Sequence, residues 1–145
     1  MMDRNLKVEK SISITASKEE VWEVLTHPEK IKVYLFGTQT QTDWKVGSPI
    51  SFTGEYQGTT YHDKGNVLSN EAYQSLKYNY WSAMSGLEDN PDNYSIITYT
   101  LHEESSNQIL FTWKQEGFGS VEGHAHTEQF LPDMLKVIKE LAENK

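Results

Sequence analysis

The sequence ITASKEEVWEVLTHPEKI, residues 14–31, carries the signals that decide how the fold begins. Ser17 and Glu20 have the spacing of a capping box, in which the serine hydroxyl accepts from the Glu20 amide and the glutamate reaches back to the Ser17 amide. The apolar residues after the box recur at helical spacing; they are Val21, Trp22, Val24 and Leu25. Pro28 disfavours helical geometry in the residue before it and suits the first position of a helix. We therefore expect one helix to end just before Pro28 and a second to cover residues 28–36.

Short strand-like segments lie on both sides of this stretch. Before it, residues 8–15 place Val8, Ile12 and Ile14 on one face, as in a strand. After it, further strands are expected at residues 38–43, 50–56, 61–68, 76–80, 97–101 and 111–115. Turns are expected at residues 45–49, 57–59, 69–71 and 103–107, with a longer loop at 86–93 and a break of the last strand at 117–119. Consecutive strands of this kind form an antiparallel meander.

The C-terminal segment changes to helical periodicity. Its apolar residues recur at intervals of three and four; they are Phe130, Leu131, Met134, Leu135, Ile138 and Leu141. Pro132 conflicts with a helix interior, so the helix either begins near it or starts near Val121 and is kinked. We expect the second arrangement, with the charged residues facing water; these are Lys136, Lys139, Glu140 and Glu143.

Together these elements predict a single domain over residues 1–145, of the α+β class. We expect a curved antiparallel sheet of about six to seven strands, two short helices and a long C-terminal helix. A sheet with one apolar face must cover it, and the C-terminal helix is the longest predicted element. This arrangement leaves an aromatic-lined space between sheet and helix.

The composition excludes several classes of function. The formal net charge is −8 with 13 basic residues, whereas surfaces that bind nucleic acid need clustered Lys and Arg. Nucleic acid and anionic membranes are therefore discounted as partners. The absence of Cys excludes disulfides and thiolate metal sites. No apolar run resembles a signal peptide or a membrane span, so a cytoplasmic location is expected.

Several aromatic residues fall on the inward face of the expected strands. Buried tyrosine hydroxyls need hydrogen-bond partners, and a cavity with a ligand or water supplies partners that a dry core does not. Ordinary core packing is the alternative, and it fits each aromatic residue taken alone. Taken together, they predict a ligand-binding pocket lined by Phe52, Tyr78, Tyr80, Tyr99, Trp113, Gln115 and Met134.

No motif indicates catalysis, a metal or a cofactor. His124 and His126 are two residues apart, which does not place both imidazoles on one helical face. Residues 89–93 resemble a calcium loop but lack its glycine and its terminal glutamate. No hydrolase elbow, Walker loop or dinucleotide fingerprint is present, although cyclase-type sites have no linear signature. Scattered strand residues could act as acid or base only if turned inward; they are Glu55, His62, His102 and Glu116. We therefore predict no catalytic residue, no metal site and no cofactor.

Residues 14–31 resemble the opening of the START-like (SRPBCC, helix-grip) superfamily, which reads I-x-A-S-x-E-x-V-W-x-x-L-T-D-P-E-x-I. Residues 43–50, DWKVGSPI, resemble a turn of the branch named for homology to the activator of the heat shock protein 90 ATPase. Residues 65–68 match the G-x-V-L strand of that branch. The likeness covers nearly the whole chain. It departs from the pattern at His27 in place of Asp, at Ser48 in place of Gly, and in lacking the Gly-Trp near the last helix.

The resemblance implies a helix-grip fold whose cavity binds a small hydrophobic ligand, lipid-like or aromatic. Relatives also include chaperone ATPase activators, so an interaction protein that modulates a chaperone in the stress response is the alternative. A cyclase or hydrolase is a further alternative. The expected partners are thus a small hydrophobic ligand or a chaperone, and the expected assembly is a monomer or homodimer.

Overall fold

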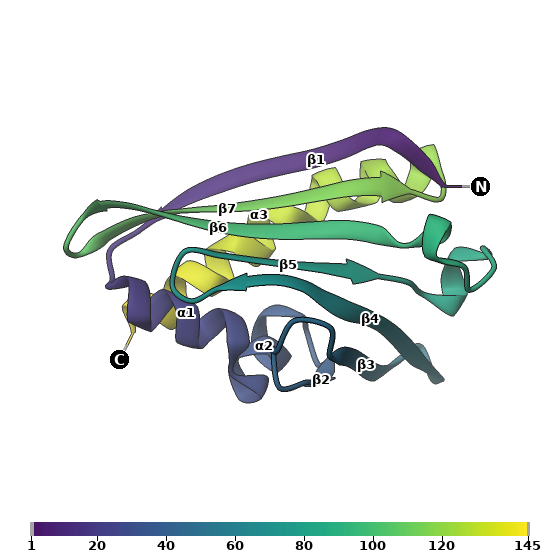
Figure 1. Ribbon diagram of the computed structural model, residues 1–145, viewed down its shortest axis with the longest axis horizontal. Helices are drawn as coiled ribbons and strands as arrows, with labels where there is room; N and C mark the ends of the chain where they lie inside the picture. Colours follow the sequence, from purple (N-terminus) through teal and green to yellow (C-terminus); the bar gives the residue numbers. More distant parts are fainter. Residues whose placement is uncertain (1, 145) are drawn as a thin grey trace.

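The computed structural model describes residues 2–144, and its main element is one antiparallel sheet of seven strands (Figure 1). The strand order across the sheet is β1-β7-β6-β5-β4-β3-β2, so the strands after β1 form a meander and β1 joins its far edge beside β7. The strands are β1 (Asp3–Ile14), β2 (Gln39–Gln41), β3 (Pro49–Tyr56), β4 (Thr59–Glu71), β5 (Ser75–Tyr80), β6 (Ser95–Ser105) and β7 (Gln108–Phe118). The predicted α+β class and the curved antiparallel sheet are confirmed.

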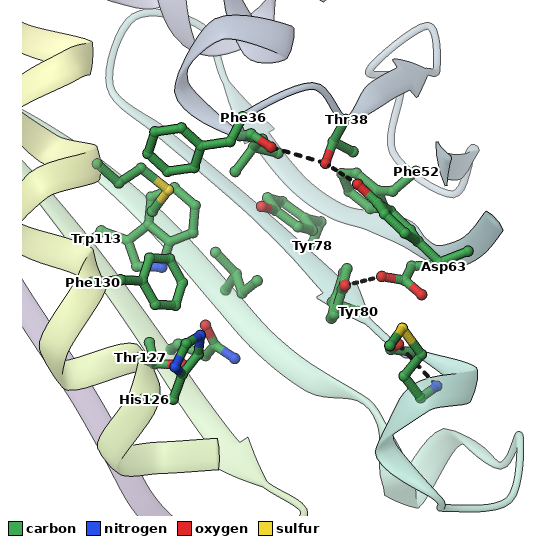
Figure 2. Close-up of a pocket in the computed structure, with 17 residues that line it drawn as sticks. Phe36, Thr38, Phe52, Asp63, Tyr78, Tyr80, Trp113, His126, Thr127 and Phe130 are labelled. Atoms are coloured by element: carbon green, nitrogen blue, oxygen red, sulfur yellow. Dashed lines mark hydrogen bonds between the residues drawn. The ribbon is translucent and has the colours of Figure 1, made fainter. Parts of the chain in front are cut away.

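Three α-helices and two 3₁₀ turns complete the described chain. They are α1 (Lys18–Thr26), α2 (Pro28–Tyr34), η1 (Ala83–Ser85), η2 (Pro91–Asn93) and α3 (Val121–Glu143). In Figure 1, α3 crosses behind β1, β7 and β6, and it packs most extensively on β1. α1 and α2 contact α3 and lie at the same end of the sheet as its C-terminus. Part of the concave face remains uncovered and faces an open pocket (Figure 2).

The predicted junction between the first two helices is confirmed. Ser17 Oγ accepts from the Glu20 amide at 3.1 Å, and Glu20 Oε1 accepts from the Ser17 amide at 2.9 Å, so the capping box is formed. His27 ends α1 and also caps α2, because its Nδ1 accepts from the Glu29 amide at 3.2 Å. The imidazole therefore replaces the aspartate of the family pattern as the helix cap.

The long helix α3 begins at Val121 and contains Pro132, as expected for a helix that continues through the proline. Pro132 itself is exposed. The residues that α3 buries in the core are Thr127, Leu131, Met134, Leu135, Ile138 and Ala142. This apolar stripe runs the length of the helix and explains why one proline does not end it.

The predicted turn at residues 69–71 is wrong, because these residues continue β4. A bulge between Val67 and Ser69 shifts the register and lets the pairing with β5 resume. The chain turns only afterwards, where Tyr73 adopts a φ of 67°. A bulge changes which residues of a strand face inward, so the alternation of apolar residues in the sequence does not predict where β4 ends.

Other predicted boundaries are shifted by a few residues. β1 begins at Asp3 rather than at residue 8, and β6 extends to Ser105, into the expected turn. Gly117 does not break β7 but bends it, with a φ of 92°, before Phe118 pairs with Asp3.

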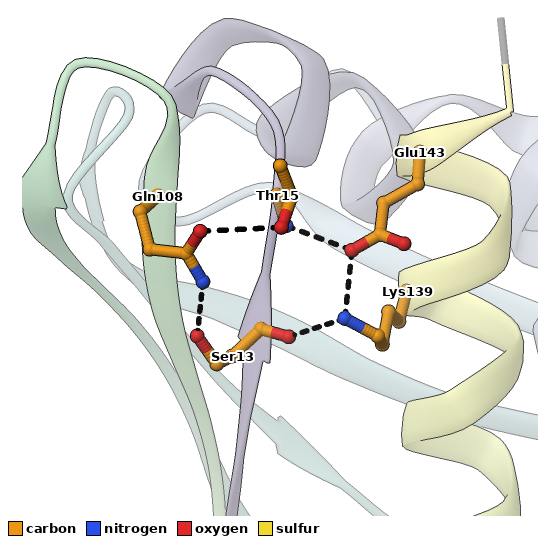
Figure 3. A network of polar contacts seen from close by, with 5 residues as sticks. All are labelled: Ser13, Thr15, Gln108, Lys139 and Glu143. Carbon is orange, nitrogen blue, oxygen red and sulfur yellow. Dashed lines mark hydrogen bonds and ion pairs between the residues drawn. The ribbon is translucent and has the colours of Figure 1, made fainter.

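The end of α3 is tied to the end of β1 by a polar network (Figure 3). Lys139 Nζ donates to the Ser13 carbonyl at 2.8 Å and lies 2.7 Å from Glu143 Oε2, which also accepts from the Thr15 amide at 2.8 Å. Gln108 of β7 bonds both the Ser13 and the Thr15 hydroxyls. Lys139 and Glu143 were expected to face water, and both are partly exposed, but the sequence did not predict that they also bond the end of β1. Both side chains are long enough to reach back to the sheet while remaining partly exposed.

Replacing Glu143 with alanine is expected to lower the free energy of unfolding by about 1 kcal/mol at neutral pH, because the Thr15 amide and Lys139 lose their acceptor. Lys139, followed by the Thr15 amide, lowers the pKa of Glu143 in the folded chain. A carboxyl group with a lowered folded pKa stabilises above its unfolded pKa, and this contribution disappears as the pH falls through the folded value. The loss caused by Glu143→Ala should therefore shrink below about pH 4, as measured by urea unfolding at several pH values.

The matched control is Glu140→Ala, on the exposed side of the same helix end. It should change the free energy of unfolding by less than about 0.5 kcal/mol. Equal losses in the two variants, or a Glu143→Ala loss that persists undiminished in acid, would contradict a role for the network.

Candidate functional site

The pocket lies between the concave face of the sheet and residues 126–134 of α3, and its volume is about 490 Å³ (Figure 2). The sheet supplies most of its wall: Phe52, Tyr61, Asp63, Tyr78, Tyr80, Ile97, Trp113 and Gln115. The helix supplies His126, Thr127, Phe130 and Met134. The rim is completed by residues from 35–38, after α2, and from 82–84, at η1.

The pocket exists because α3 lies to one side of the sheet. The helix packs on β1 and reaches α1 and α2 at its other end. The pocket-lining side chains of β3 to β6 lie beyond the part of the sheet that α3 covers. The two rim segments, residues 35–38 and 82–84, border them instead. The cavity is therefore a consequence of the helix position rather than of missing side-chain volume.

Six of the seven predicted ligand-binding residues lie in the pocket wall: Phe52, Tyr78, Tyr80, Trp113, Gln115 and Met134. Tyr99, the seventh, does not line the pocket. Its ring packs behind the wall, 4.7 Å from the Trp113 ring centroid and 5.6 Å from that of Phe111. Its side chain thus supports the wall from the core side. Ligand contact by the other six remains a prediction.

The tyrosine hydroxyls find partners within the protein, contrary to the expectation that a ligand or water supplies them. The Tyr78 and Tyr99 hydroxyls are 2.7 Å apart, and the Tyr34 hydroxyl donates to the Leu25 carbonyl at 2.9 Å. The Tyr80 hydroxyl donates to Asp63. The register of β5 on β6 explains the first pair, because Tyr78 pairs with Ile97 and is thus a diagonal neighbour of Tyr99, which a single strand cannot show. These tyrosine hydroxyls therefore do not require a ligand as a hydrogen-bond partner.

Asp63 is the main residue that the sequence prediction missed. It lies on β4 with only 6% of its surface exposed. Tyr80 donates to its Oδ2, while Oδ1 is buried and has no hydrogen-bond partner among residues 2–144. Asp63 shares the inward face of β4 with Gly65 and Val67, and a charged residue in that position was the signal that could have revealed it.

A second unpaired polar atom lies in the same wall. The indole nitrogen Nε1 of Trp113 is buried, and nothing in the described part of the chain accepts its hydrogen. Trp113 as a whole is 4% exposed. The pocket thus presents one free acceptor and one free donor within surroundings that are mostly apolar.

The mouth of the pocket is rimmed by exposed side chains. Phe36 is 66% exposed and Met84 is 62% exposed, although both are apolar. Phe36 has a φ of 53°, which is unusual for a bulky residue, and precedes Gly37 at 105°. Figure 2 shows the Phe36 ring reaching from the end of α2 toward the α3 side of the opening. α2 therefore ends at Tyr34, two residues earlier than predicted.

The histidines of α3 have separate structural contacts. His124 Nε2 lies 2.8 Å from the Lys7 carbonyl, whereas the His126 ring lies tilted against that of Phe130, with 5.1 Å between the ring centroids. Among residues 2–144, no group of three His, Asp or Glu side chains is arranged to hold a metal ion. Within the same residues, no helix has the length and apolar character needed to span a membrane.

The sequence matches a family model described as activator of Hsp90 ATPase homolog 1-like protein over residues 15–143. The solution structure of ChR145 from Cytophaga hutchinsonii is 35% identical, with 99% of this chain and 97% of that one covered and a TM-score of 0.82. No curated protein matches the sequence.

Two more distant structures share the fold. CV1439 from Chromobacterium violaceum is 20% identical, with 97% of this chain and 99% of that one covered and a TM-score of 0.79. The Aha1 dimer from Colwellia psychrerythraea is 16% identical, with 95% and 96% covered and a TM-score of 0.73.

The buried phenols predict a two-step alkaline titration. Burial raises the pKa of Tyr34, Tyr78 and Tyr99 in the folded chain, whereas an exposed tyrosine ionises near pH 10, about its usual value. A group with a raised folded pKa stabilises fully below its unfolded pKa and loses this contribution as the pH rises. The free energy of unfolding should therefore fall above about pH 10. Tyrosinate absorbance should rise first for exposed tyrosines and then, with unfolding, for the buried ones.

A phenylalanine variant assigns the second step. Tyr99→Phe removes one of the buried phenols and should reduce that step. A single step near pH 10 that includes all eight tyrosines would contradict the buried cluster.

Proposed function

The chain belongs to the family of activator of Hsp90 ATPase homolog 1-like proteins, and we propose that it binds a small, largely apolar molecule in the pocket between the sheet and α3. The observation that carries this proposal is the pocket itself. Its volume of about 490 Å³ lies within the range of known small-molecule sites, roughly 300–1,000 Å³.

The wall of the pocket favours an apolar guest. Phe52, Tyr78 and Trp113 present aromatic surface to it, and each Å² of apolar surface removed from water contributes about 25 cal/mol. The exposed side chains of Phe36 and Met84 at the mouth would be covered by the same guest. A bound molecule thus removes apolar surface from water on both its inner and outer sides.

Catalysis is the second candidate, and the contact between Asp63 and Tyr80 is the observation that favours it. Two titratable groups within hydrogen-bonding reach inside a cavity are what general acid–base catalysis requires. However, burial and then the adjacent Asp63 carboxylate raise the pKa of Tyr80. Its phenol therefore holds its proton firmly at neutral pH, which makes it a poor acid, so binding ranks first.

An interaction with a chaperone is the third candidate, because the family description names Hsp90 ATPase activation. Exposed apolar side chains would give such a partner a contact surface; they include Phe36 at the mouth, and also Val33 and Val46. Stimulated ATP turnover of Hsp90 by the added chain would support this candidate. Unchanged turnover together with no co-purification would remove it.

The proposal includes a cytoplasmic location, with the chain acting as a monomer or homodimer. The Colwellia protein is described as a dimer, and sedimentation of the present chain would determine its own state.

The fluorescent amine N-phenyl-1-naphthylamine, which is apolar and brightens when it leaves water, is expected to bind with saturation. Ile97→Trp should weaken its binding about tenfold or more, because Ile97 lies in the pocket wall and the larger ring would fill the space. The measurement is a fluorescence titration, supported by a thermal shift with fatty acids, sterols and flavonoids.

The matched control is Thr98→Trp, since adjacent residues of a strand point to opposite faces and Thr98 is absent from the pocket wall. It should bind the probe as the unaltered chain does. Failure of the unaltered chain to bind any probe, or equal weakening by both variants, would refute the proposed pocket.

A further inference from the structure

We infer that Asp63 makes the pocket select apolar molecules that carry a hydrogen-bond donor, an alcohol or an amine, over molecules of the same shape that carry a carboxylate. This inference rests on the proposed binding function and adds the chemical class of the ligand.

The carboxylate of Asp63 is positioned by the sheet rather than by a flexible loop. Asp63 pairs with Phe52 of β3 in the strand register, and both side chains reach the pocket wall. Tyr80 of β5 holds one carboxylate oxygen, which fixes the orientation of the group (Figure 2). The remaining oxygen, Oδ1, is buried and has no donor among the described residues.

A buried carboxylate oxygen without a donor is costly, because a polar group removed from water loses its hydration and gains nothing in return. A ligand that donates a hydrogen bond to Oδ1 would offset this cost. An apolar ligand without a donor would leave the cost in place. The free energy of binding therefore depends on whether the ligand carries a donor.

The described residues that line the pocket include no Lys or Arg to pair with Asp63. The imidazole among them, His126 of α3, packs against the Phe130 ring, and no hydrogen bond or ion pair joins it to Asp63 in the described part of the chain. Lys64, the next residue on β4, pairs instead with Asp89 and lies over the Trp81 ring, 5.6 Å from its centroid. A carboxylate ligand would thus meet a like charge at low dielectric, which disfavours it.

The free donor of Trp113 is a separate feature of the wall. Trp113 lies on β7 and Asp63 on β4, three strands away, which is roughly 14 Å at the usual strand spacing. One hydroxyl group cannot bond both, so selection for a donor depends on Asp63 alone.

Head-group selection can be tested on the unaltered chain with three ligands of one chain length: 1-decanol, decylamine and decanoate. Each competes with bound N-phenyl-1-naphthylamine in a fluorescence titration. We expect decanol and decylamine to displace the probe at concentrations about tenfold lower than decanoate, as a hydrogen bond to a charged group predicts. Equal displacement by all three, or stronger displacement by decanoate, overturns the inference while the pocket stands. If the probe itself does not bind, the proposed function fails as well.

The variant Asp63→Asn keeps the side-chain shape and the acceptor for Tyr80, but it removes the charge and adds a donor. We expect decanoate to gain affinity and the tenfold preference to shrink to about threefold or less. The control is Asp133→Asn, at an exposed position of α3, which changes the net charge equally and should keep the preference. A preference that survives in Asp63→Asn, or is lost equally in Asp133→Asn, overturns the assignment to Asp63. If Asp63→Asn does not fold, the head-group series on the unaltered chain decides the question alone.

Discussion

A single helix is too narrow to cover a seven-stranded sheet, and this difference in width determines which part of the sheet is left to form the pocket. Seven strands spaced about 4.8 Å apart make a sheet roughly 29 Å wide, whereas a helix with its side chains is about 10 Å across. α3 is 23 residues long, so its length of about 35 Å is ample and its width is not. It covers the β1 side, and α1 and α2 fill one end of the sheet. The rest of the concave face becomes the pocket wall.

Polar groups on the concave face differ in whether they have a partner within the protein. The Tyr78 hydroxyl in the pocket wall bonds that of Tyr99 beneath it, and the Tyr34 hydroxyl donates to the Leu25 carbonyl. In the pocket, Asp63 and Trp113 each keep one buried polar atom without a partner in residues 2–144. A third such atom, Thr40 Oγ1 on β2, is buried outside the pocket wall. What distinguishes Asp63 and Trp113 is therefore their place in the wall, where a bound molecule would lie against their side chains.

Local signals in the sequence predicted the local structure well. The capping box, the proline at the start of α2 and the helical stripe around Pro132 each act within a few residues, and all three appear as expected. Alternation placed the strands, and their order along the chain predicted the meander and its cover by the last helix; the resemblance to START-like proteins implies the same arrangement. What failed depends on contacts across strands. The bulge after Val67 hid the true end of β4, and strand register alone brings the tyrosine hydroxyls together. Asp63 could be placed on an inward face and Lys64 on the opposite one by alternation, but the contact between Asp63 and Tyr80 depends on how β4 and β5 lie in the folded sheet.

The rim residue Phe36 has a consequence for how molecules exchange with solvent. It belongs to the short link between α2 and β2, outside every helix and strand, and most of its ring is exposed. Exposed side chains change rotamer within picoseconds to nanoseconds, far faster than a sheet or a packed helix rearranges. The pocket is already open to solvent, so rotation of the Phe36 side chain changes the width of the mouth without any movement of the backbone. The mouth therefore adjusts to molecules of different size, whereas Asp63 and its neighbours are held on paired strands.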